Sequence, residues 1–393
     1  MVRTIPFTVE VPQEKLGWVR RRVEEYPWQT LDDLDDWRFG PPVGYMRRVA
    51  EYWLSSYDWR AGERELNRFP QFRAEVEDGL VLHFVHERGS GTDPDAVVLI
   101  HGWPSSPYDF WEMIEPLAHP ERFGGDPEEG LDVVVPSLPG YAWSGKPPGG
   151  PQARRHEAAQ IHELMTSVLG NERYFAGGGD FGAMVSAWMA VNRPESVRGI
   201  HIYAPNVRPA GGGFFETNPP EDFTREEREY LLWEMGYLQA RLSYAQVQGS
   251  SPQTFAYAQM DSPIGQAAWL IEKFQRWTDE SGGRLPDEVF GLDRLLTAVM
   301  VYLVSDSFDT SIWAYPDVYL DPPTLEPGQR VEVPVGLLAC ADPLVPVPPR
   351  SFVERAYNVA RWTDVPEAGH FAAFQRPDQV REDLQGFLRQ VRE

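Results

Sequence analysis

Short apolar runs alternate with helical stretches through much of the first half of the chain. Residues 96–100, 131–135 and 197–203 are mostly hydrophobic segments of strand length. Strands of a parallel sheet are buried on both faces, so they occur as uninterrupted apolar runs. Helical segments lie between them, for example residues 153–169, which end at Gly170. This alternation predicts an α/β fold with a doubly wound, mostly parallel sheet.

A long helical segment interrupts this pattern. Residues 205–327 are mostly helical in character and rich in aromatic side chains. Strand-like runs return at 331–341 and 360–365, before a final amphipathic helix. We therefore predict two core segments, 91–204 and 328–393, with a helical lid inserted between them. Such a lid would cover the carboxyl edge of the sheet, where open α/β sheets bind ligands.

Residues 1–90 precede the alternating pattern and are predicted to be a helix-rich N-terminal extension. The segment carries many aromatic residues between Trp37 and Trp59. Its first residues lack the apolar core of a signal peptide. No stretch of the chain approaches the roughly 18 apolar residues of a membrane span. We therefore expect a cytoplasmic protein.

The chain is strongly acidic, with 59 acidic and 36 basic side chains and a formal net charge of −23. Such a field repels phosphate backbones and anionic lipid surfaces, so we expect no nucleic-acid or membrane partner. The single cysteine, Cys340, excludes an internal disulfide. Its place in the apolar run 335–340 predicts a packed strand residue.

The sequence around Asp180 has the spacing of a nucleophile elbow. Gly178 and Gly182 flank it in the pattern Gly-x-nucleophile-x-Gly, which occurs where a strand turns abruptly into a helix. No Gly-x-Ser-x-Gly pattern occurs in the chain. A carboxylate suits attack on the sp³ carbon of an epoxide or alkyl halide, because the ester formed can be hydrolysed at its carbonyl. The alternative is a glycine-rich turn in which Asp180 caps a helix.

Two backbone amides are candidates for an oxyanion hole. His101-Gly102-Trp103-Pro104 directly follows the first hydrophobic run. In hydrolases of this fold, a backbone N–H from this loop pairs with the N–H that follows the nucleophile. These donors would be Trp103 and Phe181. We expect His101 to support the loop rather than to transfer protons.

His370 is the candidate general base. It lies after the last predicted strand, and the chain order nucleophile, acid, histidine is that of α/β-hydrolases. Asp342, after the preceding strand, is the favoured acid to orient it, with Glu354 and Asp364 as alternatives. Another placement for this acid, after the third hydrophobic run, holds Asn206 and is not favoured.

No metal or cofactor is expected. His156-Glu157 and His162 superficially resemble a metal site, but the position that the zinc pattern requires to be histidine holds Gln160. We interpret this segment as a helix surface. Neither a phosphate-binding loop nor a dinucleotide fingerprint occurs in the chain.

These motifs together resemble those of the microsomal-type epoxide hydrolases, including their soluble bacterial and fungal relatives. Residues 52–72 are similar to the N-terminal domain of that family, and 101–104, 178–182 and 369–373 resemble its core motifs. The resemblance spans nearly the whole chain. It implies an α/β-hydrolase fold and the conversion of an epoxide to a vicinal diol through an aspartyl ester.

The resemblance also implies two lid tyrosines that hydrogen-bond the epoxide oxygen. The segment that begins at Tyr244 and the stretch Trp313-Ala314-Tyr315-Pro316 match the two tyrosine segments of the family. Tyr244 and Tyr315 would therefore bind substrate together with Trp103 and Phe181. A phenol with a pKa of about 10 stays protonated at neutral pH and can donate to an emerging alkoxide.

Two departures from the family pattern lie near the expected site. Residues 343–346 form a slightly longer connection than the family pattern has before residues 349–352. Gln266 and Ala267 stand where aliphatic residues are usual, which predicts an unusually shaped or polar pocket.

The favoured partner is a small, apolar or aromatic epoxide, and two other functions remain as alternatives. A haloalkane dehalogenase shares the fold and the aspartate, but commonly has a tryptophan beside the nucleophile where this chain has Phe181. A catalytically silent binding protein could use the same fold. The arginine-rich composition fits actinobacterial relatives that act on natural-product epoxides, including enediyne intermediates. The aromatic N-terminal extension leaves a homodimer open.

Overall fold

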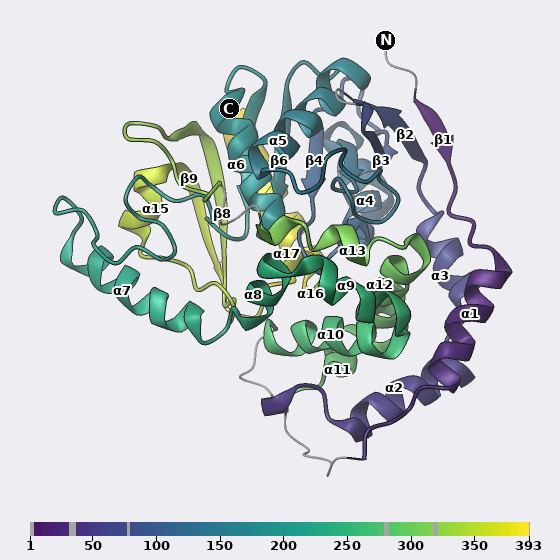
Figure 1. Cartoon of the computed structure of the whole chain (residues 1–393). Coiled ribbons are helices and arrows are strands. Elements are labelled where there is room, and N and C mark those ends of the chain that lie inside the picture. Colours follow the sequence, from purple (N-terminus) through teal and green to yellow (C-terminus); the bar gives the residue numbers. More distant parts are fainter. Residues whose placement is uncertain (1–3, 31–36, 77–78, 279–282, 317–320, 393) are drawn as a thin grey trace.

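A nine-stranded sheet organises the computed structural model, which describes residues 4–30, 37–76, 79–278, 283–316 and 321–392. The strand order among these residues is β1-β2-β3-β5-β4-β6-β7-β8-β9. Neighbours from β1 to β5 pair antiparallel, and all neighbours from β5 to β9 pair parallel. Figure 1 shows helices on both faces of this sheet. The predicted doubly wound, mostly parallel α/β fold is therefore confirmed.

The central strands coincide with the predicted hydrophobic runs. β4 and β5 are buried at every residue because both of their faces are covered. Cys340 is buried at the end of β8. The strands are β1 Ile5–Phe7, β2 Gln71–Glu75, β3 Val81–Glu87, β4 Ala96–Ile100, β5 Asp132–Pro136, β6 Tyr174–Gly178, β7 Val197–Ile202, β8 Val331–Cys340 and β9 Tyr357–Val365.

The core helices follow the parallel strands. The helix predicted over 153–169 is α5, extended by a π-helical turn, Leu164–Val168, and Gly170 after it has a φ of 80°. Glycine tolerates this left-handed conformation, so the helix stops there. The core helices are α4 Trp111–Ala118, α5 Arg154–Glu163, α6 Asp180–Asn192, α15 Arg350–Ala356, α16 Ala372–Gln375 and α17 Pro377–Arg392.

The described residues between β7 and β8 are mostly helical, and we call this segment the lid. In Figure 1 most of its helices gather beneath the sheet, while α7 extends to one side below α15. The lid helices are α7 Arg225–Gln239, α8 Ser243–Ser250, α9 Pro252–Asp261, α10 Pro263–Arg276, α11 Pro286–Phe290, α12 Leu292–Ser305 and α13 Phe308–Ser311.

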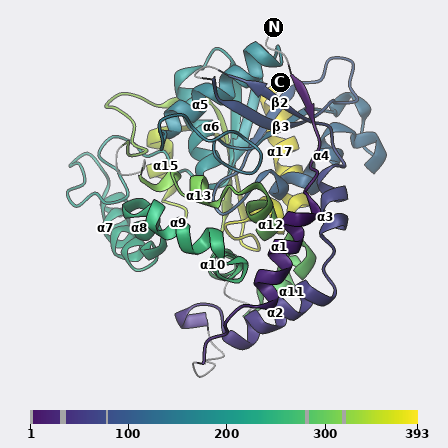
Figure 2. The same cartoon turned by 45° about the vertical axis from the view of Figure 1, so that its right-hand side comes forward.

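The N-terminal extension joins the sheet to the lid. β1, β2 and β3 extend the sheet, and α1 Gln13–Glu24 and α2 Val43–Ser55 pack against α10 and α12 (Figure 2). These strands were not predicted, because the expected unit was only helix-rich.

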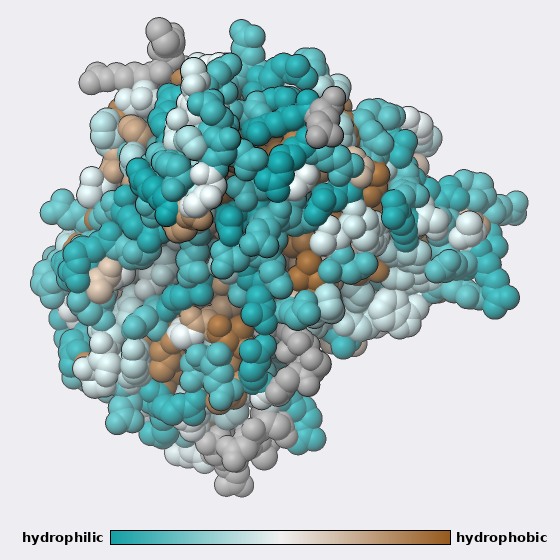
Figure 3. All heavy atoms as spheres, turned by 180° about the vertical axis from the view of Figure 1, so that it is seen from behind, coloured by the Kyte–Doolittle hydropathy of each residue, from teal (hydrophilic) through white to brown (hydrophobic). Residues whose placement is uncertain are grey.

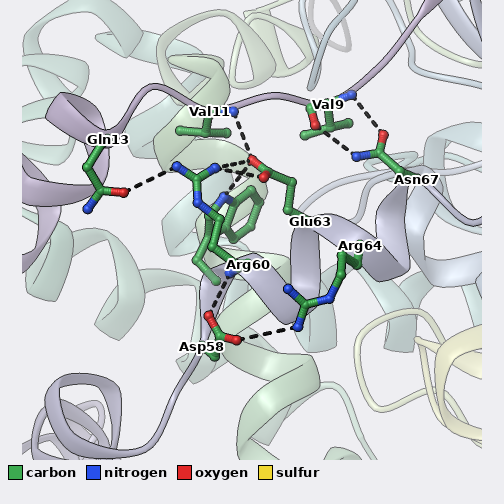
Figure 4. Close-up of polar contacts among 9 residues, drawn as sticks. Val9, Val11, Gln13, Asp58, Arg60, Glu63, Arg64 and Asn67 are labelled. Carbon is green, nitrogen blue, oxygen red and sulfur yellow. Dashed lines mark hydrogen bonds and ion pairs between the residues drawn. The ribbon is translucent and has the colours of Figure 1, made fainter.

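Polar contacts hold the connecting chain of this extension against α3 Trp59–Leu66 (Figure 4). Val9 exchanges two hydrogen bonds of 2.8 Å with the Asn67 side chain, through its N–H and its C=O. The Val11 N–H donates to Glu63 Oε2 at 2.8 Å, and Arg60 donates to the same carboxylate. These contacts fix the path between β1 and α1.

The outer surface carries few continuous apolar areas on the face drawn in Figure 3, where hydrophilic side chains predominate. Within the described ranges, no single helix is long and apolar enough to cross a membrane. One pair of helical segments, Leu292–Ser305 and Phe308–Pro316, meets that criterion only together and is bent by 99°.

Candidate active site

β6 turns directly into α6 at Asp180, where the backbone is strained. Asp180 has a φ of 50°, in the left-handed region that non-glycine residues rarely adopt. A Cβ at Gly182 would lie 1.8 Å from the carbonyl oxygen of Ile100, and a Cβ at Gly178 would lie 2.0 Å from it. Because α6 and β4 approach this closely, only glycine fits on either side of Asp180. The strand, turn and helix of a nucleophile elbow are therefore present.

The two amides expected at the oxyanion hole both face the Asp180 carboxylate. The Trp103 N–H donates to Asp180 Oδ1 at 2.9 Å, and the Phe181 N–H also hydrogen-bonds this side chain. A Cβ at Gly102 would lie 2.3 Å from Asp180 Oδ1, so glycine is required beside Trp103. The Asp180 carboxylate is thus held by two backbone donors.

His101 supports the loop that carries Trp103. Its Nε2 accepts from the Leu138 N–H at 3.1 Å, and its Nδ1 lies 2.9 Å from the Gly102 carbonyl oxygen. Burial lowers the pKa of His101 to about 4, so the ring is neutral at physiological pH. Its contacts agree with the expected structural role.

His370 lies between two carboxylates, that of Asp342 after β8 and that of Asp180 at the start of α6. Its Nδ1 is 2.8 Å from Asp342 Oδ2, and its Nε2 is 3.5 Å from Asp180 Oδ2. The Leu344 N–H donates to the other oxygen of Asp342 at 2.7 Å, which fixes the orientation of that carboxylate. His370 Nε2 is buried and has no hydrogen-bond partner among the described residues. The ring is therefore held on one side and free on the side that faces Asp180.

The two alternative acids lie away from His370 and have other partners. Glu354 is on α15, where Arg350 Nε donates to it at 2.7 Å. Asp364 is an exposed residue of β9 and accepts from Trp362 Nε1 at 3.0 Å. Of the three candidates, the structure brings only Asp342 into contact with His370.

The site's charges shift the pKa of its titratable groups. Burial alone would lower the pKa of His370, but Asp342, Asp180 and Asp109 outweigh this effect and raise it to about 9. Burial raises the pKa of Asp180, while His370 and the two amides counteract this shift. Asp109 was not predicted from the sequence; it is buried nearby, and burial raises its pKa to about 6.

Tyr244 and Tyr315 meet above Asp180 in an aromatic cluster. Their ring centroids are 5.6 Å apart, and the Trp103 ring lies 5.6 Å from Tyr244 and 5.5 Å from Tyr315. Phe181 contacts Tyr315 at 5.4 Å. Burial raises the pKa of both tyrosines well above the ordinary value. Both hydroxyls are therefore protonated and can act as hydrogen-bond donors.

A cavity of about 90 Å³ lies between Asp180 and the lid. Gln266 and Ala267 are buried elsewhere in the lid and are not among its described lining residues, so the prediction that they make this pocket polar is wrong. The lining is mostly apolar and consists of Asp180, Phe181, Met184, Asn206, Phe214, Phe215, Leu238, Leu242, Tyr244, Ala245, Tyr315, Leu344 and Val345.

Two further residues belong to the site: Trp277, which was not predicted, and Asn206, which the sequence placed only at a disfavoured position for the acid. The Trp277 ring lies 4.9 Å from both His370 and Tyr244, and its carbonyl accepts from the His370 N–H at 2.8 Å. Asn206 lines the cavity, and its Oδ1 is buried without a partner among the described residues. Trp277 belongs to no local motif, and only its spatial neighbourhood identifies it.

Glu157 and His162, two of the residues considered as metal ligands, have other contacts. Arg154 donates to Glu157 at 2.5 Å, and His162 Nδ1 lies 2.8 Å from the Tyr174 hydroxyl. No group of three histidine, cysteine or acidic side chains within the described ranges is arranged to hold a metal ion.

Comparison with known proteins identifies the family. The model of the epoxide hydrolase N terminus matches residues 4–110, and that of the alpha/beta hydrolase fold matches 95–278. A putative epoxide hydrolase of Stigmatella aurantiaca is 34% identical over 98% of this chain and 85% of its own length. The chain belongs to the epoxide hydrolase family. This epoxide hydrolase is also 28% identical to epoxide hydrolase 1 of Sus scrofa, over 98% of this chain and 88% of that protein.

Solved structures agree with this assignment. The Aspergillus niger epoxide hydrolase superimposes on this epoxide hydrolase with a TM-score of 0.80 at 29% identity, covering 99% of this chain and 97% of the other. The juvenile hormone epoxide hydrolase of the silkworm Bombyx mori gives 0.83 at 23% identity, covering 100% and 95%, a similarity of fold. The expected α/β-hydrolase fold and epoxide hydrolase activity are thus confirmed.

Proposed function

We propose that this epoxide hydrolase opens apolar or aromatic epoxides to vicinal diols through a covalent ester on Asp180. One observation carries this proposal: His370 Nε2 is unpartnered among the described residues and lies 3.5 Å from Asp180 Oδ2, while its Nδ1 contacts Asp342. Asp180 is therefore placed to act as nucleophile, His370 as base and Asp342 as the acid that orients the base. The mostly apolar lining of the cavity supports the substrate class.

In the first step, Asp180 Oδ2 attacks one ring carbon of the epoxide. The new bond joins this oxygen to carbon, and the bond from that carbon to the epoxide oxygen breaks. Tyr244 and Tyr315 donate hydrogen bonds to the departing oxygen, which takes a proton from one of the hydroxyls. Asp180 Oδ1 keeps its hydrogen bond from the Trp103 N–H and becomes the ester carbonyl oxygen.

In the second step, water hydrolyses this ester. Ester formation removes the charge of Asp180, one of the carboxylates that raise the pKa of His370, so that pKa falls and the ring is neutral and able to accept a proton. His370 Nε2 takes a proton from water, and the resulting hydroxide attacks the Asp180 carbonyl carbon. The two amides stabilise the oxyanion, and the diol leaves with Oδ2, which takes the proton back from His370. The new Asp180 carboxylic acid then gives its proton to the tyrosine that lost one in the first step, which restores the resting enzyme.

The route of the water oxygen tests the ester. Styrene oxide is turned over once by excess enzyme in ¹⁸O-water, and mass spectrometry follows both the diol and the Asp180 peptide. We expect an unlabelled diol and a labelled peptide. A labelled diol with an unlabelled peptide would mean direct attack by water and would refute the ester. Chloride release from a haloalkane panel, without diol, would instead indicate a dehalogenase.

A further inference from the structure

Two lid tyrosines contact the loop that follows Asp342. The Tyr237 hydroxyl donates to the Pro343 carbonyl oxygen at 2.7 Å, and the Tyr230 hydroxyl lies 2.9 Å from that of Pro346. Tyr230 and Tyr237 are seven residues apart on α7, two helical turns, so they project from the same face. We call these two tyrosines and residues 343–346 the tyrosine clamp. The longer connection noted in the sequence thus has a partner in the lid.

The clamped loop contributes to both the acid and the pocket. The Leu344 N–H donates to Asp342 Oδ1, and Leu344 and Val345 line the cavity beside Asp180. Pro343 and Pro346 have no backbone N–H, so their carbonyls are the groups through which a neighbour can hold them. A shift of this loop would therefore move the acid and one wall of the pocket together.

A buried ion pair fixes α7 at the base of the clamp. Glu234 lies on the same face as the two tyrosines, and its Oε1 is 2.5 Å from Arg208 Nη2 and 2.6 Å from the Tyr230 hydroxyl. Arg208 and Glu234 are 1% and 0% exposed. A pair this buried adds little net stability because both charges lose their hydration, but losing one partner is costly. It therefore restricts α7 to one position.

Arg208 also joins the two ends of the lid. Its N–H donates to the Pro323 carbonyl at 2.8 Å, and its carbonyl accepts from the Leu325 N–H at 2.8 Å. Its guanidinium lies 4.1 Å from the ring centroid of Phe214, which lines the cavity. Arg208 thus ties the segment by which the chain enters the lid to the segment by which it leaves. Through Glu234, the same residue is linked to α7 and so to the loop after Asp342.

We propose that Tyr237 and Tyr230 are positioning residues. By holding the loop after Asp342 against α7, they keep Asp342 aligned with His370. The inference rests on the proposed ester mechanism and assigns the clamp to its second step. Ester formation uses Asp180 and the tyrosines Tyr244 and Tyr315, so it does not need the orienting acid. Ester hydrolysis needs His370 oriented by Asp342. Loosening the clamp therefore slows hydrolysis selectively.

Tyr237→Phe tests the clamp because it removes one hydroxyl and keeps the ring. Rapid quenching with mass spectrometry of the Asp180 peptide measures ester formation and ester hydrolysis separately. We expect hydrolysis to slow about tenfold, as the loss of one hydrogen bond allows, so that the ester accumulates. Formation should stay within about twofold. Tyr230→Phe should have a smaller effect because that hydroxyl shares one proton between Glu234 and Pro346.

Tyr257→Phe is the matched control, since Tyr257 is a lid residue that is 75% exposed. It should change neither rate. Equal slowing of both steps in Tyr237→Phe, or no change in either, would overturn the clamp while the ester still forms. If the wild-type enzyme forms no ester, the proposed function itself fails and the clamp falls with it. These two failures are distinguished by the wild-type peptide alone.

Discussion

Two buried histidine–aspartate pairs in this protein have nearly the same contact distance and different surroundings. His370 Nδ1 lies 2.8 Å from Asp342, and His201 Nε2 lies 2.9 Å from Asp383. The second pair joins β7 to α17. Its carboxylate also accepts from Arg361 at 2.5 Å and from Thr363 at 2.7 Å. Burial and contact distance alone therefore do not distinguish the two pairs.

What separates them is the environment of the remaining atoms. Burial would raise the pKa of Asp383, but hydrogen bonds from His201, Thr363 and Arg361 outweigh it and lower the pKa to about 2. The oxygens of the Asp383 carboxylate are therefore occupied by hydrogen bonds that stabilise the fold. His370 instead keeps one ring nitrogen free toward Asp180 and has a pKa of about 9. A histidine–aspartate pair can act as a base only when its second nitrogen faces a reacting group.

Replacing each histidine should give the largest contrast. His370→Gln removes the proposed base, so turnover of styrene oxide should fall on the order of a thousandfold and the Asp180 ester should accumulate. His201→Gln should keep turnover within about threefold but lower the melting temperature, because it leaves part of the Asp383 network unpaired. Steady-state rates and thermal unfolding measure both. Normal turnover in His370→Gln would refute the proposed role.

Replacing each aspartate should separate rate from stability. Asp342→Asn should lower kcat about a hundredfold, because the ring loses its orientation and the charge that supports its protonated form. Asp383→Asn should cost about 3 kcal/mol in the free energy of unfolding, because Arg361 loses its buried partner. Urea denaturation measures the second effect. A stable Asp383→Asn enzyme with impaired turnover would break the comparison.

The two pairs should affect stability at opposite ends of the pH range. His370 has a folded pKa of about 9, above its ordinary 6.5, so its contribution is complete below 6.5 and is lost as pH rises toward 9. Asp383 has a folded pKa of about 2, below its ordinary 3.8, so its contribution is complete above 3.8 and is lost as pH falls toward 2.

Urea midpoints measured across pH check these signs. The wild-type decline between pH 6.5 and 9 should be shallower in His370→Gln, and the decline below pH 3.8 should be shallower in Asp383→Asn. The exchange of these two effects between the variants would contradict the assignment of the pKa shifts.

Thr363→Val should give the smallest effect. It removes one of the donors to Asp383 while keeping a side chain of similar shape, so the free energy of unfolding should fall by about 1 kcal/mol. The rate of styrene oxide turnover should not change. A slower rate would mean that this network communicates with the site after all.

The sequence was most informative where backbone geometry demands a particular residue. Gly178 and Gly182 specify the elbow because no other side chain fits against Ile100, and the order of elements then points to His370. Asp342 was harder to distinguish from Glu354 and Asp364, since the path of a loop decides which carboxylate reaches the ring. Their separation needed the three-dimensional structure.

Residues that meet only through the fold were not predictable. Trp277 lies at the end of a lid helix and reaches His370 across the chain, with no local pattern to mark it. The strands β1 to β3 were missed for a related reason: they pair antiparallel within a segment whose helical pattern dominated. Gln266 shows the converse error, because an unusual residue type in the lid was assigned to a pocket that it does not line.

The left-handed backbone of Asp180 bears on how this enzyme can be improved in the laboratory. Glycine at that position would relieve strain of about 1 kcal/mol while removing the carboxylate. Selection for heat resistance or expression yield alone would thus favour inactive proteins at this position. Variant libraries of this enzyme should be ranked by diol formed, with robustness as a second criterion.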